Sequence, residues 1–155
     1  MSYVETNLIP GEQVFYKTGL HWSVLVGPVL FGAIFGLVGL FLLFAGDTRI
    51  VGFLFLVFAG LLILLGYLAR KATEMAVTNK RIIIKVGLLS RRTLELLLSK
   101  VESIGVEESL VGRMLGYGSV VVRGTGGTPE RFNTIAHPIE FRKQVQQRVE
   151  EREQK

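Results

Sequence analysis

The 155-residue sequence predicts a membrane protein, in which a hairpin of two transmembrane helices precedes a small α+β domain. Two apolar stretches that lack Asp, Glu, Lys and Arg, residues 18–46 and 50–69, predict the hairpin. The change after residue 71 from a continuous apolar run to short alternating segments predicts the domain. We therefore divide the chain into an N-terminal segment (1–21), the hairpin (22–69) and the α+β domain (70–155).

Both apolar stretches are long enough to cross a bilayer. A helix rises about 1.5 Å per residue and the hydrocarbon core is about 30 Å thick, so about 20 residues suffice. Of the 20 residues from Ile50 to Ala69, 14 are Leu, Ile, Val or Phe, which favours insertion. We predict spans at about residues 23–45 and 50–69. The first span starts too late and is too long for a cleavable signal peptide, so we interpret it as an uncleaved anchor.

Positive charge is concentrated directly after the second span. Between Arg70 and Arg92 there are seven basic residues and one acidic residue, whereas the short loop before Ile50 offers only Arg49. The positive-inside rule therefore predicts that both ends of the chain are cytoplasmic, and for a bacterial chain the membrane is the inner one. The absence of cysteine excludes disulfides and fits a reducing compartment.

Small residues indicate where the two predicted helices meet. Such residues allow the close backbone approach by which helices associate in lipid. We favour packing within the hairpin, and the alternative is oligomerisation through Gly32 and Gly36. Neither span carries Asp, Glu, Lys or Arg, which argues against a transporter or a proton channel. The candidate packing residues are Gly32, Gly36, Gly39, Gly52, Ala59 and Gly66.

The domain is predicted to contain six or seven antiparallel strands followed by one helix. Asn79 and Lys80 are predicted to form a tight turn, because Asn tolerates positive φ. Pro138 suits the first turn of a helix whose apolar stripe is Phe141, Val145 and Val149, and residues 150–155 are expected to fray. Residues 12–17 are expected to supply an extra edge strand. The predicted strands are residues 74–78, 81–86, 93–98, 101–106, 119–123 and 131–135.

Ordered sequence blocks resemble the bacterial membrane-associated pleckstrin-homology-like (PH-like) family. They are residues 77–82 (VTNKRI), 87–89 (GLL), 98–106 (LSKVESIGV) and 110–120 (LVGRMLGYGSV). The resemblance covers about residues 70–147, and a preceding two-helix hairpin is common in that family. It implies a bent antiparallel sheet of about seven strands, capped by the C-terminal helix.

Catalysis finds little support in the sequence, and we predict no enzyme activity, no cofactor and no metal site. The two histidines, His21 and His137, belong to no cluster with metal-ligand spacing, and capping or solvation explains each. The glycine-rich run at residues 123–128 lacks the P-loop pattern and is interpreted as a hairpin turn. With no aromatic-studded basic strand and no recognition helix, nucleic acid is not an expected partner.

A basic cluster on and around one predicted hairpin is the candidate binding surface. Anionic lipids attract such residues by about 1 kcal/mol each near a membrane surface. Two interpretations stay open: the cluster contacts lipid headgroups or a partner, or it is solvated charge that only fixes the topology. The cluster consists of Lys80, Arg81, Lys85, Arg91 and Arg92.

These observations favour a non-enzymatic protein of the bacterial inner membrane that presents a PH-like binding or scaffolding module. Its partners would be the lipid bilayer together with a membrane-protein partner or a second copy of the chain, and exposed sheet edges suit strand addition by a partner. One alternative is a sensor of anionic lipid headgroups. Another is an accessory subunit of a membrane transport or secretion complex.

Overall fold

A computed structural model describes residues 3–88 and 90–154, apart from the side chain of residue 153. Leu89, the last residue of the second family-like block, lies outside the described residues. The chain forms two compact units. One, the hairpin unit, is Trp22–Arg70, and the other, the folded unit, combines Met1–His21 with Lys71–Lys155. The N-terminal segment that the sequence analysis treated separately thus belongs to the same unit as the chain after the hairpin.

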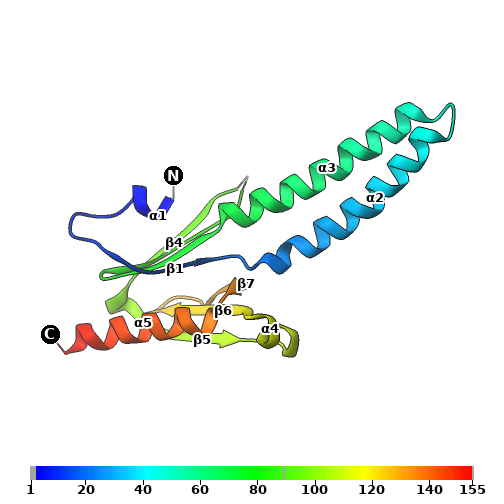
Figure 1. Ribbon diagram of the computed structural model, residues 1–155. Coiled ribbons are helices and arrows are strands. Elements are labelled where there is room, and N and C mark those ends of the chain that lie inside the picture. The colour runs from blue at the N-terminus through cyan, green and yellow to red at the C-terminus, as the bar shows by residue number, and fades with distance from the viewer. Residues whose placement is uncertain (1–2, 89, 155) are drawn as a thin grey trace. The chain divides into compact units, whose positions relative to one another are not determined.

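The hairpin unit consists of two long apolar helices (Figure 1). The 3-10 turn η1 (Trp22–Leu25) leads into α2 (Val26–Phe44), and α3 (Arg49–Ala72) returns. Both are long and apolar enough to cross a membrane, as predicted. In the loop between them, Gly46 has a φ of 79°, and the hydroxyl of Thr48 donates to the carbonyl of Leu42 at 3.0 Å. The Ala45 amide donates to the same carbonyl at 3.4 Å, so the loop adds a second hydrogen bond at the end of α2.

Small residues form the contact between α2 and α3. Gly32, Gly39, Gly52, Ala59 and Gly66 are buried. A Cβ atom added at Gly52 would lie 2.7 Å from the Gly39 carbonyl oxygen, and one at Gly39 would lie 2.8 Å from that of Gly52.

The sixth candidate, Gly36, is less tightly placed. Its added Cβ would be 4.0 Å from the Cβ of Ala59, an ordinary contact distance. The candidate packing residues therefore lie along a contact inside the hairpin, the arrangement that the sequence analysis favoured.

Seven antiparallel strands in two sheets build the folded unit. One sheet has the order β1-β2-β3-β4 and the other the order β5-β6-β7, so the predicted antiparallel strands are present and are divided between two sheets. A short helix, α1 (Tyr3–Thr6), precedes them. The strands are β1 (Val14–Gly19), β2 (Glu74–Thr78), β3 (Arg81–Val86), β4 (Arg92–Leu97), β5 (Val101–Glu107), β6 (Tyr117–Gly124) and β7 (Glu130–Ala136).

The edge strand expected from before the hairpin is present. β1 pairs with β2, from Val14 opposite Thr78 to Gly19 opposite Glu74. The tight turn between β2 and β3 is also confirmed, but its physical reason is different. Among the described residues, the non-glycine residues with positive φ are Thr134 and His137, so Asn79 does not use the left-handed conformation.

The core of the folded unit lies where α5 (Pro138–Glu153) covers the sheets (Figure 1). Phe141 and Val145 of α5 are fully buried, and they meet Met75, Ile82 and Val120 from both sheets. Residues 150–153, which were expected to fray, continue α5 as helix, and residue 155 lies outside the described residues. The apolar stripe predicted on this helix is the face that the core uses.

The sequence analysis predicted neither α1 nor α4 (Leu110–Leu115), and the second of these lies between β5 and β6. The hydroxyl of Ser109 accepts the amide of Gly112 at 3.0 Å and caps its start. Gly116, with a φ of 78°, ends it in the left-handed conformation. At six residues, the helix is too short for its apolar spacing to be recognised.

Candidate functional site

An open groove runs between β5 and α5. Strand β5 is the outer strand of its sheet, so on one side it pairs with β6 and on the other its backbone meets no neighbouring strand of that sheet. An edge strand directs the N–H and C=O groups of alternate residues away from the sheet, where another strand can bind them. We call this feature the β5–α5 groove and define it by residues 98–104 on one wall and 145–152 on the other.

Two adjoining hollows make up the β5–α5 groove, and both are lined by Val101 and Val149. Their volumes are about 150 Å³ and about 270 Å³. The buried side chains of Leu98 and Val145 contribute to the lining and provide an apolar floor. The groove is therefore wide enough for side chains of an extended segment and apolar at its base.

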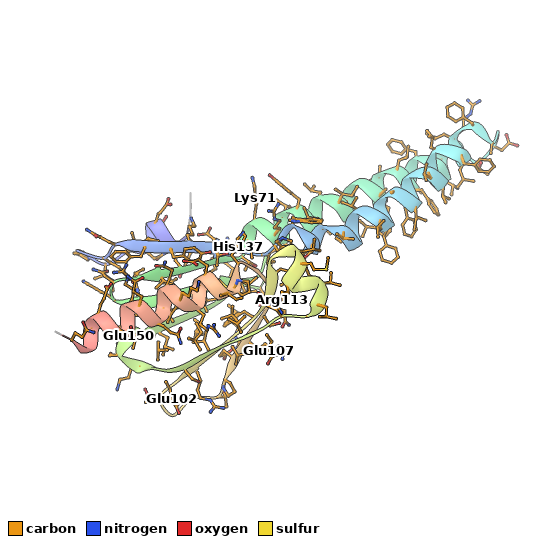
Figure 2. All side chains as sticks on the ribbon, turned by 60° about the horizontal axis from the view of Figure 1, so that its bottom comes forward. Lys71, Glu102, Glu107, Arg113, His137 and Glu150 are labelled. Atoms are coloured by element: carbon orange, nitrogen blue, oxygen red, sulfur yellow. The ribbon has the colours of Figure 1, made fainter. Side chains whose placement is uncertain are left out.

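The rim of the groove is polar and its charge is uneven. Glu102 from β5 and Glu150 from α5 line one hollow, and Arg152 lines the other. Figure 2 shows Glu102 on β5 and Glu150 near the end of α5. This arrangement favours an occupant with a basic group near the two carboxylates, since opposite charges attract across a partly solvated rim.

Packing holds the helical wall of the groove in place. The ring of Phe141 lies 6.4 Å from that of Tyr16 on β1, and the guanidinium of Arg148 lies 3.7 Å from the centre of the Phe15 ring. Aromatic and cation–π contacts of this kind add to the burial of Phe141 and Val145. The helix is fixed before any occupant binds, which limits the conformational entropy that binding costs.

The predicted basic cluster does not form one open surface. Arg81 is only 9% exposed and belongs to an internal ion-pair network. Arg92 Nη2 donates to both carboxylate oxygens of Glu130, at 2.5 and 2.7 Å. The ammonium of Lys85 lies 5.0 Å from the Tyr3 ring centre, and that of Lys80 donates to the Pro10 carbonyl at 2.9 Å. Arg91 is exposed.

Glu12 is the residue that the sequence analysis did not connect with this cluster. Its carboxylate is fully buried, and it accepts hydrogen bonds from Arg81 Nε and Nη2, each at 3.0 Å. The hydroxyl of Thr78 and the amide of Ile9 also donate to it, at 2.7 and 2.8 Å. Arg81 Nη1 donates to Glu95 at 2.6 Å, which completes the network.

The Glu12–Arg81 pair is stabilised in its charged form. Burial by itself would raise the pKa of Glu12, but the hydrogen bonds from Ile9, Arg81 and Thr78 and the positive charge of Arg81 lower that pKa below its ordinary value. The hydrogen bond with Glu12 raises the pKa of Arg81 in spite of its burial. Both groups therefore stay ionised inside the fold.

The turn between β2 and β3 holds the N-terminal segment through further contacts. Asn79 accepts the amide of Gln13 at 3.0 Å and donates to the carbonyl of Gly11 at 3.0 Å. Together with Lys80 and Arg81, the turn therefore binds the backbone and one side chain of residues 9–13. The family-like block at residues 77–82 therefore fixes the position of residues 9–13 through hydrogen bonds and an ion pair.

The two histidines have structural surroundings. His21 is buried and its ring stacks on Tyr117 with centroids 5.1 Å apart, so it is not solvated. His137 precedes α5 in the left-handed conformation and forms no side-chain capping bond. Within residues 3–88 and 90–154, no group of three or more His, Asp or Glu residues is arranged to hold a metal ion.

Comparison with known proteins agrees with this architecture. The family model described as Bacterial PH domain matches residues 29–151, which include most of the hairpin unit and nearly all of the chain after it. Comparison with curated proteins yields no match. The match covers well over half of the sequence, and it includes most of α2, all of α3, the six strands from β2 to β7 and most of α5, whereas β1 lies before it. The chain belongs to the bacterial PH domain family.

Proposed function

We propose that this protein is anchored in the bacterial inner membrane by its hairpin and holds a protein partner in the β5–α5 groove. Both chain ends would be cytoplasmic, because basic residues follow α3 directly whereas the loop between the helices offers only Arg49. The role is binding and scaffolding without catalysis, in line with the generally non-catalytic character of the family.

The observation that carries the proposal is an edge strand that borders a preformed apolar groove. An extended segment of the partner would pair with β5 and place alternate apolar side chains between Val101 and Val149. A basic residue of that segment would lie near Glu102 and Glu150. Main-chain hydrogen bonds would provide affinity and the groove would provide selectivity.

Recognition of anionic headgroups by the basic cluster has weaker support. Arg81 and Arg92 are engaged with carboxylates of the same chain, and Lys80 and Lys85 have partners near the N-terminus. A headgroup would have to compete with these contacts. The carboxylates that accompany the cluster also reduce its net positive charge.

A photo-crosslinking amino acid at Gln146, which is exposed on α5 and lines the groove, tests the proposal in the full-length protein in its native membrane. We expect crosslinks to protein, with the crosslinked residues of the partner in an extended segment. Ser103→Lys on the exposed edge of β5 should abolish them, because a lysine there obstructs strand addition. Native mass spectrometry of the extracted protein then shows whether the partner is a second copy.

The matched control is Thr93→Lys, on β4 at the outer edge of the other sheet. Both substitutions place lysine at an exposed edge position, so they differ only in whether the edge borders the β5–α5 groove. If both variants crosslink equally, or if Gln146 crosslinks to no protein, the groove is not the binding site.

A further inference from the structure

Helix α4 exposes large apolar side chains to an unusual degree for a folded domain. Leu110 is 85% exposed and Met114 is 87% exposed. Phe41, on the first of the two long apolar helices, is less exposed, at 73%. Val111, at 56%, adds to the same short helix. Contiguous exposed apolar surface of this kind marks a site of interaction with a membrane or a protein.

The local structure of α4 holds these side chains outward. The helix is capped at both ends, by Ser109 and by Gly116. It approaches the sheet through Gly112, where an added Cβ would lie 2.4 Å from the Tyr117 carbonyl oxygen. A surface helix in water normally buries its large apolar residues and exposes small or polar ones, and α4 does the reverse.

Contacts inside the folded unit connect the residues that follow α4 with His21, the last residue before the hairpin unit. Tyr117 follows α4 after one residue and stacks on His21, and the His21 amide donates to the Thr134 carbonyl at 2.8 Å. His21 directly precedes Trp22, the first residue of η1, which leads into α2. Figure 2 shows Arg113 on α4. Within the folded unit, α4 therefore lies near His21, the residue at which the chain passes into the hairpin unit.

We propose that α4 inserts Leu110, Val111 and Met114 into the interfacial layer of the bilayer that holds the hairpin. The inference rests on the proposed membrane anchoring and is independent of the β5–α5 groove. Its occupant is lipid, because α4 is tethered beside the bilayer and its outward side chains are apolar. This contact would limit the orientations that the folded unit takes on the membrane.

Charges around α4 indicate which lipids it would accept. Arg113 lies on the helix, and Glu107, just before it, is paired with Arg131 at 2.7 Å. Glu108 adds one negative charge, so basic and acidic groups nearly balance. Insertion is therefore driven by apolar burial, and we expect it in zwitterionic and anionic bilayers alike, with little dependence on salt.

The absence of cysteine allows a direct test in the full-length protein. Met114→Cys is labelled with an environment-sensitive fluorophore after reconstitution into vesicles of phosphatidylcholine and into vesicles that also contain phosphatidylglycerol. Quenching is measured with nitroxide lipids and with aqueous iodide. We expect several-fold stronger nitroxide quenching than for Thr128→Cys, which lies beyond the other end of β6. A second substitution, Leu110→Ser, should return the label at residue 114 toward the aqueous quencher.

Leu37→Cys, on the exposed side of α2, separates the two proposals. Lipid quenching at residue 37 without lipid quenching at residue 114 would overturn the inference while leaving the anchor intact. Absence of lipid quenching at both residue 37 and residue 114 would overturn the membrane anchor and the inference together. Shielding of residue 114 from iodide without lipid quenching would mean that protein covers α4, which also overturns the inference.

Discussion

The hairpin unit and the folded unit use apolar residues in opposite ways. In the hairpin unit, Leu37 and Phe41 point outward at 69% and 73% exposure, whereas the buried positions are glycine and alanine. In the folded unit, Phe141 and Ile82 are fully buried. Lipid is as apolar as leucine, so helices in a bilayer gain little by burying large side chains and associate through close backbone approach. In water, burial of large side chains is the main favourable contribution.

The two units also differ in their content of charged residues. The hairpin unit contains no Asp, Glu, Lys or Arg between residues 22 and 46 or between residues 50 and 69. The folded unit, in contrast, contains the buried Glu12–Arg81 pair, with hydrogen bonds to most of its polar atoms. A buried pair is tolerated where such donors and acceptors surround it. The comparison predicts that substitutions at the small-residue contact between α2 and α3 affect only the hairpin unit. Substitutions at the buried ion pair should affect only the folded unit.

The largest expected effect is from Arg81→Met, which would leave the carboxylate of Glu12 buried without its cation. We expect the folded unit to lose about 3–5 kcal/mol of stability while the hairpin unit is unaffected. Hydrogen exchange of β2 and β3 amides in the full-length protein measures the loss. The control is Arg91→Met, an exposed arginine at which the change should be within about 0.5 kcal/mol. Equal effects of the two substitutions would contradict the role of the network.

Acidification should weaken the folded unit in a way that depends on Glu12. Its pKa is lower in the folded state than in the unfolded chain, so its contribution is complete above the unfolded pKa and is lost as the pH falls through the folded pKa. We expect denaturant midpoints of the folded unit to fall below about pH 4.3. Glu12→Gln should flatten this part of the curve, and parallel curves for the two proteins would refute the assignment.

Gly52→Ala should weaken the hairpin unit and leave the folded unit unchanged. The new Cβ would lie 2.7 Å from the Gly39 carbonyl oxygen, so the helices must separate, at a cost of about 1–3 kcal/mol. Energy transfer between labels on α2 and α3 during SDS titration reports this change. Gly36→Ala is the matched control, because its Cβ meets Ala59 at 4.0 Å. Similar midpoints for the two variants would mean that the helices pack differently.

The smallest expected effect is from Arg92→Gln. The Arg92 side chain is 69% exposed, so its pair with Glu130 is worth at most about 1 kcal/mol in spite of two hydrogen bonds. Hydrogen exchange of β4 and β7 amides in low and high salt provides the measurement. A loss as large as that from Arg81→Met would show that burial does not distinguish the two ion pairs.

Local patterns predicted most elements of the fold. The apolar runs located both long helices to within about three residues, and alternation located the strands after the hairpin to within about two. The stripe of Phe141, Val145 and Val149 identified the face of α5 that contacts the sheets. These features depend on neighbours along the chain, so composition and spacing are sufficient to recognise them.

The candidate site was harder to predict from the sequence than the fold. Strand addition at a sheet edge was expected, but the β5–α5 groove joins residues about 45 positions apart, and no local pattern pairs Ile104 with Val145. The basic cluster was recognised as charge, yet which of its residues are engaged depends on carboxylates, a carbonyl and an aromatic ring that lie elsewhere in the sequence. Glu12 lies 69 residues from Arg81, and a glutamate after a Pro-Gly turn carries no sign that it will be buried.

The sequence by itself determined the two apolar helices, the succession of strands and the amphipathic terminal helix, because these follow from periodicity and residue type over short stretches. Tertiary structure alone decided that seven strands divide into two sheets, that the turn at Asn79 clamps residues 9–13, and that α4 turns Leu110 and Met114 outward. Such outcomes depend on which distant groups compete for the same hydrogen bonds and the same buried space.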